Sequence, residues 1–190
     1  LANSLSSNEW IVANIETKPK TQNPYPPFIT STLQQEGIRK LRMNANQVMS
    51  VAQSLYQAGH ITYMRTDSVN LSTEAINAAK DVVIQKYGKE FLPKLPKQYK
   101  GKAKNAQEAH EAIRPTSASV TAKDLDKATE EEVRLYELIW QQYIACQMKD
   151  AEYLSTTAKI ILDQYTFTAK GREVVFDGYT KISNPSNKNQ

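Results

Sequence analysis

The sequence is poor in cysteine: Cys146 is the only one among 190 residues. A single cysteine excludes an internal disulfide and a cysteine-based zinc site, and its place in an apolar helical pattern predicts a buried thiol. No apolar run approaches the roughly 18 residues that a membrane span needs. The start, "LANSLSSNEW", lacks the basic and apolar regions of a signal peptide. Because the chain begins with Leu rather than Met, we expect a piece of a longer protein.

Motifs for nucleotide and metal chemistry are also missing. There is no Gly-rich phosphate loop among the six glycines, so the sequence does not support an NTPase. We expect no self-contained metal site and predict no metal ligand in this chain. The net charge of +4 and the pI near 9.0 permit a nucleic-acid partner without requiring one.

The order of patterns along the chain predicts an α+β fold. Residues 9–17 are typical of a strand, and "KPKTQNPYPPF" follows with four of the eight prolines, which favours a crossing between domains. Helical patterns then continue to about Asp150. After Ala151 the sequence is rich in Thr, Tyr, Val and Ile, with turn signals at Asp163, Gly171 and Gly178, which predicts a meander of short strands. The simplest layout is a mainly helical domain, residues 22–150, inserted into a partial antiparallel β domain formed by residues 1–21 and 151–190.

Several helices are predicted inside the central domain. Apolar stripes at 30–41 and 44–58, joined by a short turn and followed by an extended segment, fit either a helix-turn-helix with a wing or a plain helical hairpin. Ser72 and Thr129 are good N-caps, and Glu132 completes a capping box with Thr129. "NAQEAHEAIRPTS" predicts a short helix that stops before Pro115. The lysine-rich loop 94–104 is either solvated or in contact with a phosphate backbone.

The stretch "GHITYMRTDS" gathers three unusual side chains. In an extended segment, alternation places Tyr63, Arg65 and Asp67 on one face. A tyrosine attacks a phosphodiester only when its phenolate is stabilised, and Arg65 can stabilise it while Asp67 orients the guanidinium. The alternative is an edge strand with a surface ion pair worth about 0–1 kcal/mol. The pattern alone leaves both readings open.

A second polar cluster consists of His110, Glu111 and Arg114. On a helix, His110 and Arg114 share a face, where they can grip one phosphate or protonate a leaving oxygen. The alternative is an ordinary helix end with Arg114 exposed. The other histidine, His60, is too far from His110 in the sequence for the paired metal ligands of rolling-circle nucleases. Tyrosine recombinases and type IB topoisomerases place their basic residues before the tyrosine, whereas here they follow Tyr63.

Four segments carry a resemblance to a known family. "PPFITSTLQQE", "MSVAQSLYQAGHITYMRTDS", "EAHEAIRPT" and "LYELIWQQYIACQM" resemble the central region of bacterial type IA DNA topoisomerases, from about Trp10 to Ile182. The "ITYMRTDS" and "HEAIRP" motifs are specific, and they occur in the family's order. The resemblance favours the catalytic readings of the tyrosine segment, the helix-turn-helix and the histidine cluster.

The resemblance implies a role for each matching residue. Tyr63 matches the nucleophile that joins the 5′ phosphate of cleaved single-stranded DNA, and Arg65 matches the arginine that positions the scissile phosphate. His110 matches a histidine that contacts DNA near the cleavage site. The remaining predicted DNA-binding residues are Asp67, Arg114, Gln53 and Tyr56.

The resemblance also implies what the chain lacks. Residues 22–150 resemble the mobile catalytic domain with its winged-helix-like core, and the flanking strands resemble part of the β arch that hinges it. The full enzyme adds a Toprim domain that binds Mg²⁺ and further domains that guide DNA, and none of these is in this sequence. No ATP is needed, because the phosphotyrosyl bond preserves the energy for resealing while negative supercoils relax.

We therefore expect a monomeric, cytoplasmic, nucleoid-associated fragment with single-stranded DNA as partner and no membrane contact. Without its Toprim partner the fragment is expected to fold and to cleave little or nothing. The alternative function is a non-catalytic winged-helix module that binds single-stranded DNA.

Overall fold

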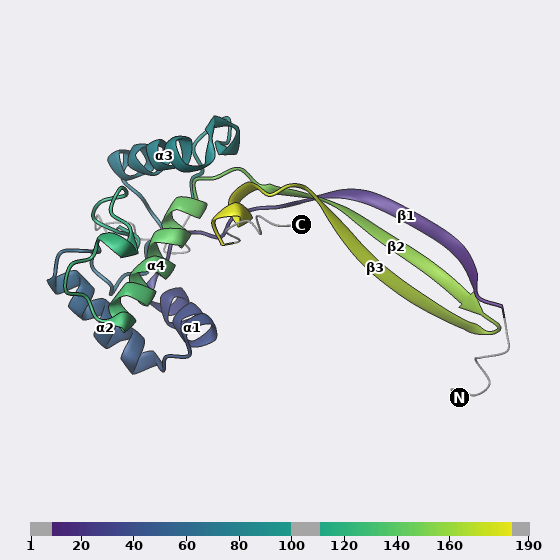
Figure 1. Cartoon of the computed structure of the whole chain (residues 1–190), viewed down its shortest axis with the longest axis horizontal. Coiled ribbons are helices and arrows are strands. Elements are labelled where there is room, and N and C mark those ends of the chain that lie inside the picture. The colour runs from purple at the N-terminus through teal and green to yellow at the C-terminus, as the bar shows by residue number, and fades with distance from the viewer. Residues whose placement is uncertain (1–8, 100–110, 184–190) are drawn as a thin grey trace. The chain divides into compact units, whose positions relative to one another are not determined.

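Figure 1 shows the computed structural model of the chain, which describes residues 9–99 and 111–183. The chain divides into two compact units, with boundaries at Asn23/Pro24, Lys149/Asp150 and Gly178/Tyr179. One unit contains the strands and the other the long helices, so the predicted α+β class is confirmed. The helical unit lies, in sequence, between the first and second strands of the sheet unit.

The sheet unit has three antiparallel strands in the order β1-β2-β3 (Figure 1). The strands are β1 (Ile11–Gln22), β2 (Ala151–Leu162) and β3 (Tyr165–Phe176). Ile11 pairs with Ile161 at one end of the β1–β2 ladder and Gln22 with Ala151 at the other. Asp163, at φ 52°, begins the tight turn between β2 and β3, as the sequence predicted.

Two sequence predictions about the strands were wrong. The proline-rich crossing was expected to begin at Lys18, but β1 continues to Gln22 with Pro19 opposite Leu154. Because β1 is an edge strand, a residue without an N–H is tolerated there. Gly171 was expected to mark a turn, but it lies within β3 opposite Thr156. The region after Ala151 is thus two long strands rather than several short ones.

The helical unit contains α1 (Thr30–Leu41), α2 (Ala45–Gln57), α3 (Thr73–Tyr87) and α4 (Glu130–Ala145), with short 3₁₀ turns at Lys89–Phe91, Ala122–Asp124 and Gly178–Ile182. Capping confirms the predicted starts: Ser72 Oγ accepts from Ala75 N–H, and Thr129 and Glu132 form the capping box of α4. Asn44 caps α2 in the same way. These local hydrogen bonds satisfy N–H groups that a helix leaves unpaired at its start.

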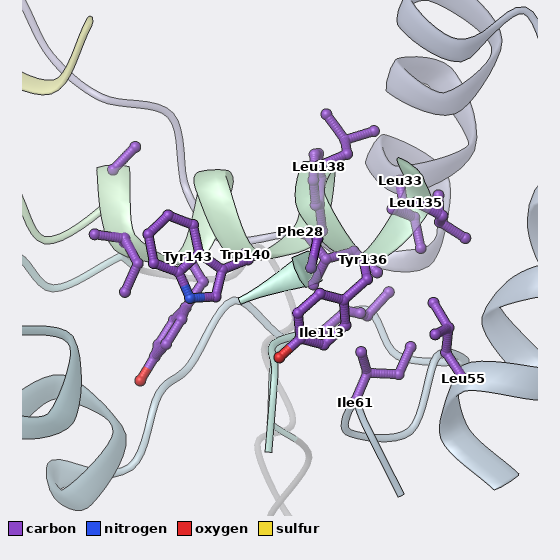
Figure 2. Packing of buried hydrophobic residues seen from close by; sticks show 14 of the residues in the cluster. Phe28, Leu33, Leu55, Ile61, Ile113, Leu135, Tyr136, Leu138, Trp140 and Tyr143 are labelled. Carbon is purple, nitrogen blue, oxygen red and sulfur yellow. The ribbon is translucent and has the colours of Figure 1, made fainter. Parts of the chain in front are cut away.

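Helix α4 lies at the centre of the helical unit and contacts α1, α2 and α3. Figure 2 shows its apolar side chains packed with Phe28, Ile61 and Ile113 from the connecting segments. The polar atoms of its aromatic residues are paired: the Trp140 indole donates to Ala118 O at 2.8 Å, and the Tyr143 hydroxyl donates to Ala75 O at 2.6 Å. Cys146 is buried, as predicted, and burial raises the pKa of its thiol to about 12.

The short helix predicted within residues 105–114, ending before Pro115, is wrong where the structure describes it. Residues 111–117 are not helical, and Ile113 forms a bridge with Phe28 and Pro115 forms one with Ile61. These pairings come from residues far away in the sequence, so the local helical pattern is overridden. In the described ranges, no helix combines the length and apolar character of a membrane span.

Candidate functional site

The segment that contains Tyr63 is not a regular strand, although the sequence predicted one. In the described residues, the β-type pairing of this segment is the isolated bridge between Ile61 and Pro115. The predicted alternation is nevertheless present, since Tyr63, Arg65 and Asp67 are all exposed and Met64 is only 1% exposed. Tyr63 is 46% exposed. The three polar side chains thus face solvent from an extended segment that its buried residues anchor.

Thr62 anchors the segment on one side of Tyr63. Its N–H donates to Arg114 O at 2.9 Å, and its hydroxyl donates to Ala112 O at 2.8 Å. The Arg114 N–H in turn donates to Thr62 Oγ1 at 3.0 Å. Residues 111–115, the described part of the "HEAIRP" motif, therefore lie beside the "ITYMRTDS" motif, although the two are far apart in the sequence.

Thr30, the first residue of α1, anchors the segment on the other side. The Thr30 N–H donates to Thr66 O at 2.9 Å, and the Thr66 N–H donates to Thr30 Oγ1, also at 2.9 Å. The Thr30 hydroxyl lies 2.8 Å from Met64 O. Together with the Thr62 contacts, these bonds hold the main chain before and after Tyr63.

A hollow of about 450 Å³ lies beside Arg65. Its lining consists of Ile29, Thr30, Ser31, Gln34, Arg65, Thr66 and Asp67. A second hollow of about 870 Å³ shares Ile29 and Asp67 and extends along α1 to Tyr25 and Arg39. Hydroxyl, amide and guanidinium groups are among those that line the first hollow. Within the described ranges, Arg65 and Asp67 form no ion pair with each other, so the surface ion pair considered for them is not formed.

Arg114 is held by Glu111 rather than exposed. Its Nε and Nη2 atoms donate to the two carboxylate oxygens of Glu111 at 2.7 and 2.9 Å. Glu111 also accepts from Ser72 N–H at 3.1 Å, at the start of α3. The side chains are 16% and 26% exposed. His110 lies outside the described residues, so its predicted position beside Arg114 stays a prediction.

The two predicted DNA-binding residues of α2, Gln53 and Tyr56, lie in the last turns of this helix. Gln53 is half-buried and Tyr56 is 40% exposed. The rings of Tyr56 and Tyr63 meet edge to face, with centroids 5.3 Å apart. Helix α2 is itself fixed against α4, because the Ser54 hydroxyl donates a hydrogen bond to the Glu132 carboxylate. This bond, together with one from the Thr129 N–H, lowers the pKa of the Glu132 carboxyl.

Sequence reasoning did not single out the residues that hold this site. Thr30, Ser31 and Gln34 line the hollow, and Thr62 fixes the two motifs against each other. Threonine and serine at a helix start look like ordinary caps in a sequence. Their contacts with residues 62–66 depend on the tertiary fold and give no local signal.

The described residues do not fit a metal. Among them there is no group of three or more His, Cys, Asp or Glu side chains that would hold one.

Comparisons with known proteins define the class to which this fold and site belong. The family described as DNA topoisomerase matches residues 1–190. DNA topoisomerase 1 of Vibrio cholerae is 47% identical over 187 residues, which is 98% of this chain and 21% of that protein. DNA topoisomerase 1 of Mycobacterium tuberculosis is 48% identical over 190 residues, which is 95% of this chain and 20% of that protein.

A solved structure agrees with these sequences. The full-length topoisomerase I from Thermotoga maritima superposes with a TM-score of 0.84 at 32% identity, covering 100% of this chain and 32% of that one. The chain belongs to the bacterial DNA topoisomerase family. It spans about one fifth of the length of the curated relatives.

Proposed function

We propose that this chain is the part of a type IA DNA topoisomerase that supplies the nucleophile, Tyr63. The observation that carries the proposal is the exposure of Tyr63 and Arg65 together, on a segment whose main chain is held on both sides by Thr62 and Thr30. An exposed phenol and guanidinium on a fixed main chain suit attack on a bound phosphodiester.

In the proposed reaction the Tyr63 oxygen attacks the phosphorus of single-stranded DNA. A phosphotyrosyl bond to the 5′ phosphate forms, the bond between phosphorus and the 3′ oxygen breaks, and the phenol gives up its proton as the leaving 3′ oxygen gains one. Arg65 stabilises the negative charge that develops on the phosphate. The reverse attack by the 3′ hydroxyl reseals the strand without ATP, so passage of a second strand relaxes negative supercoils.

The domain roles follow from the same proposal. Residues 22–150 act as the catalytic domain, and the strands of residues 1–21 and 151–190 act as part of the arch that hinges it. Mg²⁺, the Toprim domain and the C-terminal domains belong to the rest of the polypeptide. We propose a monomer that works in the cytoplasm at the nucleoid. The DNA contacts assigned to Gln53, Asp67, His110 and Arg114 stay predictions, and Arg114 reaches DNA only if its bonds to Glu111 are exchanged.

A trapping assay tests the proposal. The chain is mixed with a separately expressed N-terminal Toprim piece, Mg²⁺ and a single-stranded oligonucleotide labelled at its 3′ end, and the products are denatured and run on a gel. We expect a labelled covalent adduct with this chain that Tyr63→Phe abolishes. Tyr165→Phe, at an exposed tyrosine of β3, is the matched control and should leave the adduct intact.

An adduct that persists in Tyr63→Phe would contradict the proposal. If the two pieces associate and DNA binding by anisotropy is intact, a missing adduct would also count against it. That second outcome would favour the alternative function, a non-catalytic module that binds single-stranded DNA.

A further inference from the structure

We propose that Tyr56 is a positioning residue for the Tyr63 side chain, rather than a DNA contact. The inference rests on the proposed function, because it assigns Tyr56 a part in presenting the nucleophile. The starting observation is the edge-to-face contact of the two rings, with centroids 5.3 Å apart and planes inclined by 65°.

The position of Tyr56 itself is fixed by the end of α2. The neighbouring Leu55 is 1% exposed, and its carbonyl accepts from His60 N–H at 2.9 Å. Tyr56 O accepts from the N–H of Gly59, where a φ of 77° turns the chain back toward the tyrosine segment. Tyr56 is thus a side chain on a rigid helix end, and the turn brings Tyr63 to it.

The main chain of Tyr63 is fixed, but its side chain is not held by the core. The flanking Thr62 and Met64 are anchored, whereas 46% of Tyr63 is exposed. In the described residues the Tyr63 hydroxyl has no hydrogen-bond partner, and its ring contact is with Tyr56. An exposed tyrosine samples several χ1 rotamers, so the Tyr56 ring is the feature that favours one of them.

Edge-to-face packing explains why an aromatic side chain at position 56 can orient the Tyr63 ring. Aromatic pairs in this arrangement gain a modest free energy beyond the area they bury, which is enough to bias a rotamer while leaving the hydroxyl accessible. Neither ring is buried, so the contact does little for the stability of the helical unit. A nucleophile must lie close to and in line with its phosphorus, and displacement by about 1 Å can cost about 100-fold in rate.

The test uses the full-length protein that contains this segment, with Tyr56→Leu, Tyr56→Phe and, as control, Ser50→Leu at another exposed position of α2. Adduct formation is measured in single turnovers at saturating oligonucleotide, and affinity by anisotropy. We expect Tyr56→Leu to lower the saturated rate about 3- to 10-fold, the size of one aromatic contact, with less than a 2-fold change in Kd. Tyr56→Phe, which keeps the ring, and Ser50→Leu should stay within 2-fold of the wild type.

A spectroscopic readout tests the ring contact without using activity. 3-Fluorotyrosine is placed at position 63, and its fluorine resonance is compared between the wild type and Tyr56→Leu. Loss of the neighbouring ring should shift the signal, whereas Ser50→Leu should not.

Either of two results would overturn the inference: an unshifted signal in Tyr56→Leu, or a Tyr56→Leu variant with weaker DNA affinity and an unchanged saturated rate. The proposed function fails separately, and visibly, if the wild-type protein forms no adduct that depends on Tyr63.

Discussion

Thr30 and Thr66 exchange hydrogen bonds through both main chain and side chain. Each donates its N–H to the other, to Thr66 O and Thr30 Oγ1 at 2.9 Å, and the Thr30 hydroxyl lies between Met64 O and Thr66 O. This pair joins the start of α1 to the segment that carries Tyr63 and Arg65. A methyl group in place of the Thr30 hydroxyl would leave part-buried main-chain groups unpaired.

We therefore expect Thr30→Val to lower the free energy of unfolding by about 1–3 kcal/mol, and Thr30→Ser to lower it much less. Urea denaturation followed by Trp140 fluorescence, in a Trp10→Phe background, measures both. Thr30→Val should also slow adduct formation in the trapping assay. Equal stability of the Val and Ser variants would show that the hydroxyl does not hold the segment.

Arg65 is exposed and has no ion-pair partner in the described residues, so its substitution separates chemistry from stability. We expect Arg65→Gln to lower the rate of adduct formation about 100- to 1000-fold, the range for removing one preorganised group that stabilises an oxyanion. Arg65→Lys should retain part of the rate, because it keeps the charge but not the planar fork. Urea denaturation should be unchanged for both. A rate within 3-fold of the wild type in Arg65→Gln would remove Arg65 from the proposed mechanism.

The Arg114–Glu111 pair gives a test of whether Arg114 contacts DNA. Because the pair is mostly buried and also receives the Ser72 N–H, Arg114→Gln should cost about 1.5–3 kcal/mol of unfolding free energy. If Arg114 serves only its pair with Glu111, the salt dependence of single-stranded DNA binding should not change. A phosphate contact by Arg114 would instead reduce the slope of log K against log salt by about 0.7. Glu111→Gln is the matched variant, since it breaks the same pair and leaves the cation.

The buried phenol of Tyr143 leads us to expect that the free energy of unfolding falls at alkaline pH. Burial raises the pKa of its phenol to about 12, and the hydroxyl donates to Ala75 O. Below pH 10 both folded and unfolded states keep the proton, so the contribution to stability is complete. Above pH 10 the unfolded state loses the proton first, so that contribution falls as the pH rises toward 12.

The difference in unfolding free energy between wild type and Tyr143→Phe should therefore shrink from pH 10 to 12, by on the order of 2 kcal/mol. Urea denaturation at a series of pH values measures it, and the subtraction removes the lysines that titrate in both proteins. Parallel curves for the two proteins would contradict the assigned pKa.

The elements that the sequence predicted well are those with local causes. Ser72, Thr129 and Glu132 mark helix starts because their capping hydrogen bonds join residues only three apart in the sequence. Helices α3 and α4 begin at the positions that these residues predict. Asp163 likewise marks a turn between neighbouring strands. That Tyr63 and Arg65 share one face was predictable, because alternation is a property of any extended chain.

The predictions that were wrong concern segments whose structure depends on residues distant in the sequence. Residues 111–115 have a helical pattern, but bridges to Phe28 and Ile61 hold them extended. Pro19 looks like the end of a strand, and only the pairing of β1 at the sheet edge shows why the strand continues. The ring contact of Tyr56 with Tyr63 needs the turn at Gly59, whose direction no local pattern specifies.

The pairing of β1 with β2 has a consequence for synthesis. Ile11 meets Ile161 in the sheet, so β1 leaves the ribosome long before its partner is made, while the helices between them emerge and pack. During that interval the apolar side chains of Ile11, Val12 and Ile15 have no sheet to join. The β1–β2 pairs can therefore form only after the helical unit has been synthesised, so the sheet is completed later than the helices that its first strand precedes.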